Sequence, residues 1–111
     1  MVTDTPTPGK PDKFQPLRDA YRRALPQRVG EICDSWASAR RSGANAAQWQ
    51  TLERLLHTLA GSAGTFGCQA LGEQARALED FLRSGANCDY SERTAEIERQ
   101  LARLRLEAEK P

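Results

Sequence analysis

The sequence has little of several features that usually narrow a function. Aromatic residues make up only 6% of the 111 residues, and histidine occurs once. No stretch approaches the roughly 20 consecutive apolar residues that a transmembrane helix needs. The N-terminus also lacks the charged region followed by an apolar region that forms a signal peptide. We therefore expect a cytoplasmic protein whose domain makes no membrane contact.

The cysteines do not predict a disulfide framework or a metal site. Cys33, Cys68 and Cys88 are odd in number, widely spaced and without a C-x-x-C pair. A structural zinc site needs four ligands, and only one histidine is available to complete such a set. We expect neither a metal nor a cofactor on this chain.

Charge of one sign is also missing. The 16 basic and 15 acidic residues are spread along the chain and leave a formal net charge of +1, so no basic patch indicates nucleic acid binding. The chain has no Gly-rich nucleotide loop, no carboxylate cluster and no nucleophile–base–acid set. We expect neither ATP binding nor autonomous turnover.

The residues that are present favour helices. Good helix formers such as Ala, Leu, Glu, Gln and Arg are abundant, and 111 residues are enough for one domain with a single core. The first 13 residues hold three prolines and a glycine among polar residues, a composition that buries little apolar surface. We predict a flexible tail or linker over 1–13 and one helical domain over 14–111.

Apolar periodicity divides this domain into amphipathic segments. We predict a short helix from Phe14 to Leu25, and a longer one from Pro26 to about Arg41, because proline is well tolerated in the first turn of a helix. Gly43 supplies a stop signal. Asn45 is the expected N-cap of a central helix that ends near Gly67.

Two further helices complete the pattern. One covers about 68–83 and is closed by Ser84 and Gly85. The last begins at a capping box formed by Asp89 and Glu92. Short connections favour antiparallel neighbours. The predicted fold is all-α, an antiparallel up-down four-helix bundle with a short additional N-terminal helix, and we expect a monomer.

The single histidine is the feature with most chemical potential. On a helix, His57 lies about 140° from the stripe of Leu52, Leu55, Leu56, Leu59 and Ala63, so its ring should face solvent. Gly61 and Gly64 follow on the same face, although each glycine costs a helix roughly 1 kcal/mol relative to alanine. Two explanations are open. Either the glycines leave a bare surface that another protein's active site can approach, or they reflect close helix packing or fraying near the helix end.

The residues around His57 resemble a known signature. The string is His57-x-Leu59-x-Gly61-Ser62-Ala63, then Phe66-Gly67, Leu71, Ala75 and Leu78-Glu79. It resembles the histidine-containing phosphotransfer (HPt) domains of phosphorelays. Upstream, Leu25-Pro26-x-Arg28-Val29, Trp36 and Trp49-x-x-Leu52-x-x-Leu55-Leu56-His57 are similar to HPt domains of hybrid histidine kinases. The resemblance covers roughly residues 14–106.

This resemblance implies a phosphoryl carrier rather than an enzyme. His57 would accept a phosphoryl group from the aspartate of a receiver domain and pass it to another receiver aspartate. The implied partners are response-regulator receiver domains, with a receiver of the same hybrid kinase as one candidate. The partner receiver would supply Mg²⁺. Both a free-standing protein and a domain of a larger kinase fit this sequence.

Three side chains are predicted to support His57. If Glu79 accepts a hydrogen bond from Nδ1–H, it fixes the tautomer that leaves Nε2 with a free lone pair. The family commonly has a lysine three residues after the histidine, where this chain has Ala60. Arg54 or Arg83 is predicted to replace that charge. The alternative for Glu79 and for both arginines is a solvated surface charge.

The docking surface is predicted at Ala60, Gly61 and Gly64. Two other classes of function remain open. The first is a non-phosphorylated HPt-like module that binds a receiver or another regulatory protein, and Ala60 is its best support. The second is a structural helical adaptor, which would leave the spacing of His57, Gly61 and Gly64 as a coincidence.

Overall fold

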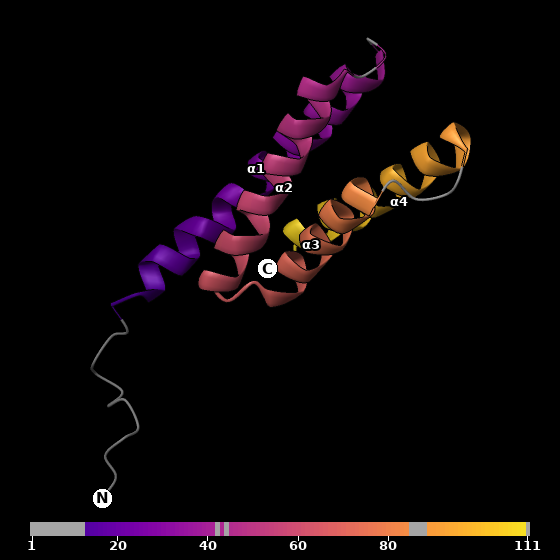
Figure 1. Ribbon diagram of the computed structural model, residues 1–111. Coiled ribbons are helices and arrows are strands. Elements are labelled where there is room, and N and C mark those ends of the chain that lie inside the picture. Colours follow the sequence, from indigo (N-terminus) through magenta and orange to yellow (C-terminus); the bar gives the residue numbers. More distant parts are fainter. Residues whose placement is uncertain (1–12, 42, 44, 85–88, 111) are drawn as a thin grey trace, which may run out of the picture.

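The computed structural model describes residues 13–41, 43, 45–84 and 89–110. These residues form four helices: α1 (Gln15–Arg41), α2 (Ala46–Thr65), α3 (Gln69–Ser84) and α4 (Tyr90–Ala108). Consecutive helices run antiparallel and side by side, and α4 returns to contact α1 (Figure 1). The prediction of an all-α, up-down four-helix bundle is confirmed. None of the helices among these residues is long and apolar enough to cross a membrane.

The predicted short additional helix is wrong, because α1 is one continuous helix from Gln15 to Arg41 with Pro26 inside it. Proline removes one backbone hydrogen bond and usually breaks a helix interior, at a cost of about 3 kcal/mol. Here the buried residues Tyr21 and Leu25 before the proline, and Val29 after it, belong to one face packed on the core. Burial of this shared face offsets the local cost.

Each helix contributes one apolar stripe to a single core. The largest fully buried side chains come in pairs, one pair from each helix: Val29 and Ile32, Leu52 and Leu56, Leu71 and Leu78, Ile97 and Leu104. The spacing of three, four or seven residues within each pair is that of a helix with one buried face. The solvent faces are therefore left for polar residues and for the candidate site.

Capping residues define where α2 and α4 begin. Asn45 caps α2 as predicted, and it forms a capping box with Gln48, whose backbone N–H donates to Asn45 Oδ1 at 2.9 Å. The predicted box of Asp89 and Glu92 opens α4. Gly67 has a φ of 82° in the turn after α2, a backbone conformation that favours glycine. The predicted 1–12 portion of the tail, Gly85 and Cys88 lie outside the described residues.

The α2–α3 pair is packed closely at a glycine that sequence analysis passed over. A Cβ added to Gly72 would lie 3.1 Å from the carbonyl oxygen of Ala60 and 3.5 Å from Cβ of Ala63. The absence of a side chain thus lets α3 approach the backbone of α2. This contact fixes how α3 sits against the helix that carries His57.

Candidate functional site

His57 projects from the solvent side of α2. Its side chain is 71% exposed, while its neighbours Leu56 and Leu59 are buried in the core. The exposure predicted from the helical periodicity is therefore confirmed. An imidazole in this position is accessible to another protein, and it is held by a helix rather than by a loop.

Glu79 of α3 reaches the same imidazole from the neighbouring helix. One carboxylate oxygen, Oε2, lies 3.1 Å from His57 Nδ1, and the other, Oε1, lies 3.4 Å from it. An ionised carboxylate can only accept hydrogen bonds, so Nδ1–H is the donor. This tautomer leaves the lone pair of Nε2 free. The imidazole is thereby oriented through Nδ1, and Nε2 makes no hydrogen bond to any residue that the structure describes.

The carboxylate of Glu79 is buried, with only 3% of the residue exposed. A buried charge is costly unless it is paired and hydrogen-bonded. Arg83, one turn later on α3, places Nη2 2.7 Å from Glu79 Oε2. The same guanidinium approaches Glu53 of α2, with 3.7 Å between Nε and Oε1. Arg83 therefore neutralises Glu79 and connects the two helices that form the site.

A shallow hollow opens between α2 and α3 beside the imidazole. It is lined by His57, Ala60 and Gly61 of α2 and by Arg76, Glu79, Asp80 and Arg83 of α3. Sequence analysis missed Arg76, Asp80 and Glu53. The first two were detectable, because residues 76, 79, 80 and 83 recur at the spacing of a single helix face. Glu53 was detectable as the residue one turn before His57.

Two other predicted residues, Arg54 and Ala60, contribute less to the hollow than His57, Glu79 and Arg83. Arg54 is exposed on α2 and is not among the residues that line the hollow, so its supporting role stays a prediction. Ala60 lines the hollow but is only 6% exposed, and its backbone carbonyl lies against Gly72 of α3. A docking surface beside His57 therefore has to consist mainly of residues other than Ala60.

Gly61 and Gly64 are exposed on the His57 side of α2. A Cβ added at either position would meet nothing within 4 Å. Close helix packing therefore does not explain these two glycines, unlike Gly72. They leave the helix backbone bare next to the imidazole, as the bare-surface interpretation requires.

Ser62 links α2 to α1 on the side away from α3. Its Oγ lies 2.6 Å from the hydroxyl of Tyr21 and donates to the carbonyl of Leu59 at 3.3 Å, so the Tyr21 hydroxyl donates to Ser62. The Tyr21 ring stacks on Phe66, with centroids 4.7 Å apart. Burial raises the pKa of the Tyr21 phenol, which stays protonated at neutral pH. This contact anchors the helix that carries His57.

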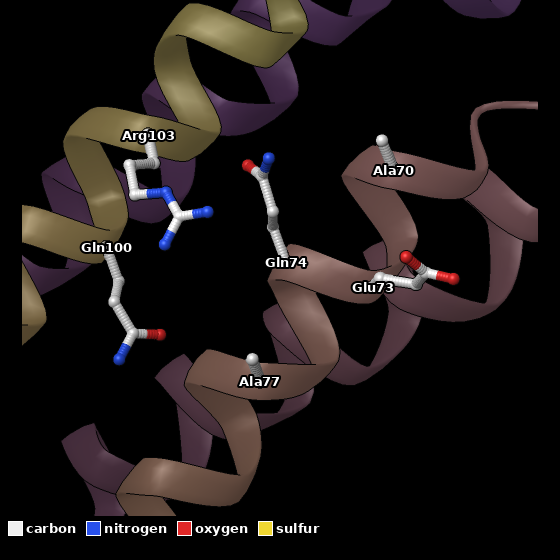
Figure 2. Close-up of a pocket in the computed structure, with 6 residues that line it drawn as sticks. All are labelled: Ala70, Glu73, Gln74, Ala77, Gln100 and Arg103. Atoms are coloured by element: carbon white, nitrogen blue, oxygen red, sulfur yellow. The ribbon is translucent and has the colours of Figure 1, made fainter.

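A second hollow lies between α3 and α4. Figure 2 shows the residues that line it: Ala70, Glu73, Gln74, Ala77, Gln100 and Arg103. Gln100 and Arg103 belong to α4, and the other four residues lie on a different face of α3 from Glu79 and Arg83. None of the six is a histidine, so this hollow offers no imidazole to carry a phosphoryl group.

The fold and the site define a helical bundle that presents an oriented, exposed imidazole. The family model described as "Hpt domain" matches residues 16–107. The chain therefore belongs to the Hpt domain family, whose members are phosphoryl carriers in phosphorelays rather than enzymes. No curated protein and no solved structure gives a significant match.

Proposed function

We propose that the chain carries a phosphoryl group on Nε2 of His57, receiving it from the aspartate of one receiver domain and passing it to the aspartate of another. The contact of 3.1 Å between Nδ1 and Glu79 Oε2 is the observation that supports this function most directly. It selects the tautomer in which Nε2 is the nucleophile, on a side chain that is 71% exposed.

The transfer step balances with groups that the two proteins provide. The Nε2 lone pair attacks the phosphorus of the aspartyl phosphate, and the Nε2–P bond forms. The P–O bond to the aspartyl oxygen breaks, and its electron pair leaves with the aspartate carboxylate. The proton on Nδ1 stays in place, so the phosphorylated ring is cationic. Transfer to the next receiver reverses these bond changes.

Glu79 has two roles in this proposal. It orients the ring before transfer, and its negative charge stabilises the positive charge that the ring gains when Nε2 bonds to phosphorus. Since Nδ1 remains protonated, the imidazole is also a good leaving group for the onward step. Arg83 holds the Glu79 carboxylate in place through the 2.7 Å contact. Glu79 thus assists both the transfer to His57 and the transfer from it.

The proposed partners are response-regulator receiver domains in the cytoplasm. The partner receiver brings Mg²⁺ and the acidic pocket around its aspartate, while this chain brings the nucleophile. Gly61 and Gly64, where an added Cβ would meet open space, give that pocket room to approach His57. We propose that the chain acts as a monomer, with one imidazole for each transfer.

The test is transfer of labelled phosphate from a panel of phosphorylated receiver domains to the chain, with His57→Gln as the control. We expect label that is labile in acid, stable in base and abolished in the variant. The exposed position tolerates the change, and circular dichroism should show an unchanged helical signal. Label retained by His57→Gln would contradict the site. Receiver binding without label across the panel would favour a non-phosphorylated interaction module.

A further inference from the structure

The charges in the hollow beside His57 come from one helix only. The α2 residues that line it are His57, Ala60 and Gly61, and none of these carries a permanent charge. All formal charges come from α3, as Arg76, Glu79, Asp80 and Arg83. Among the residues that line the hollow, the cations that could contact a phosphoryl group are therefore the two arginines of α3.

The two arginines differ in what they already bind. Arg83 forms ion pairs with Glu79 at 2.7 Å and with Glu53 at 3.7 Å, so its guanidinium is engaged by two carboxylates. Arg76 is exposed, and it forms no ion pair with any residue that the structure describes. Its positive charge is therefore available to an anion that enters the hollow.

The antiparallel packing places Arg76 on the other side of Glu79 from Arg83. Residues early in α3 lie beside residues late in α2: Gly72 packs on Ala60, Glu79 contacts His57, and Arg83 approaches Glu53. Arg76 lies between the first two pairs along this sequence. It therefore enters the hollow between the levels of Ala60 and His57, where the lining residues of α2 carry no permanent charge.

A phosphoryl group at Nε2 would need such a charge. It brings about −1.5 to −2 units of charge at neutral pH to a hollow that already contains the carboxylates of Glu79 and Asp80. Phosphoryl transfer depends mainly on positioning and on stabilisation of the charge on the equatorial oxygens. A guanidinium suits this task because its planar donors match phosphate oxygens.

We propose that Arg76 is the catalytic residue of this chain that binds the phosphoryl group carried on His57. Arg76 donates to the phosphoryl oxygens, and Arg83 holds Glu79 against Nδ1. The two arginines thus serve opposite sides of the imidazole. This assignment rests on the proposed function, since it requires that His57 is phosphorylated.

The experiment uses the whole chain with two donors, phosphorylated receivers and the small molecule phosphoramidate, which has no docking surface. The variants are Arg76→Ala and Arg76→Lys, with Arg105→Ala as the matched control, since Arg105 is an exposed arginine of α4. Labelling rates are measured with both donors. Phosphorus NMR then follows the titration of the phosphoryl group on His57 in each phosphorylated protein.

We expect Arg76→Ala to slow labelling about fivefold, the effect of one partly exposed charge contact, with both donors. Removal of the cation should also raise the pKa of the phosphoryl group, because its dianionic form loses a partner. Arg76→Lys should restore most of the rate and of the pKa, whereas Arg105→Ala should match the parent in both. Circular dichroism checks that each variant is folded.

Two outcomes separate this inference from the function on which it rests. If the parent is labelled on His57 and Arg76→Ala matches it in rate and in the titration of the phosphoryl group, Arg76 has no role and the carrier function stands. If neither donor labels His57 in the parent, the carrier function and the role of Arg76 both fail. If Arg76→Ala were unfolded, an Arg76→Lys variant that titrates with the raised pKa would overturn the charge contact.

Discussion

The two sides of α3 have opposite characters. Toward α2, the helix presents Gly72, which allows close backbone packing, and Glu79, a buried carboxylate bonded to His57 and Arg83. Toward α4, it presents Gln74, whose Oε1 is buried without a hydrogen-bond partner among the described residues, beside the hollow shown in Figure 2. The first side brings the helix backbones close together and pairs its buried carboxylate with a cation, whereas the second leaves a buried polar atom without a partner among the described residues.

This difference shows that a hollow alone does not identify a functional site. Both hollows contain charged side chains, since Glu73 and Arg103 line the one between α3 and α4. Only the hollow beside α2 combines an exposed imidazole with a buried carboxylate held by a cation. The chemistry depends on this ordered set of contacts, because orientation of the imidazole decides which nitrogen is free to react.

Of these predictions, we expect the largest effect from substitution of Glu79, on the α2 side of α3. Glu79→Ala removes the acceptor at Nδ1 and leaves Arg83 paired only with Glu53. We expect phosphoryl transfer to slow at least tenfold, or about 1.4 kcal/mol in the barrier. Glu79→Gln should recover part of the rate, because the amide oxygen still accepts from Nδ1–H. Rapid-quench transfer from a phosphorylated receiver gives the rates, and parental rates in Glu79→Ala would show that Glu79 does not act in transfer.

The next effect concerns packing between α2 and α3. Gly72→Ala places a methyl group 3.1 Å from the Ala60 carbonyl, so the helices must separate. Alanine is the better helix former by about 1 kcal/mol, but we expect the clash to exceed this gain and to lower the free energy of unfolding by about 1 kcal/mol.

Gly64→Ala is the matched control for this packing, since its added Cβ meets open space. It should stabilise the chain by up to about 1 kcal/mol through helix propensity. Urea denaturation midpoints of the two variants and of the parent test this contrast. A gain in stability for Gly72→Ala equal to that for Gly64→Ala would show that the close approach is not limiting.

The smallest effect is expected on the α4 side. Gln74→Met removes a buried amide oxygen that has no partner among the described residues and keeps a side chain of similar length. We expect the free energy of unfolding to rise by about 0.5 kcal/mol, because an unsatisfied buried acceptor is costly. Transfer to His57 should stay at the parental rate. Slower transfer, with stability unchanged, would show that the α4 side communicates with the site.

The local features of this protein follow from its sequence. The apolar spacing predicts the stripes of the four helices, and Asn45 and Asp89 predict the starts of α2 and α4, because periodicity and capping involve residues within one or two turns. The exposure of His57 follows from the same periodicity. The one local error was at Pro26, where burial on both sides of the proline outweighs a rule based on isolated helices.

The contacts between helices were decided by the tertiary structure. Helical spacing places Arg83 one turn after Glu79. The proximity of Arg83 to Glu53 and the place of Arg76 in the hollow with Ala60 depend on the axial position and rotation of α3 against α2. The close approach at Gly72 helps to set both. Helical periodicity tells which residues share a face of one helix, but it carries no information on which residue of the next helix lies opposite.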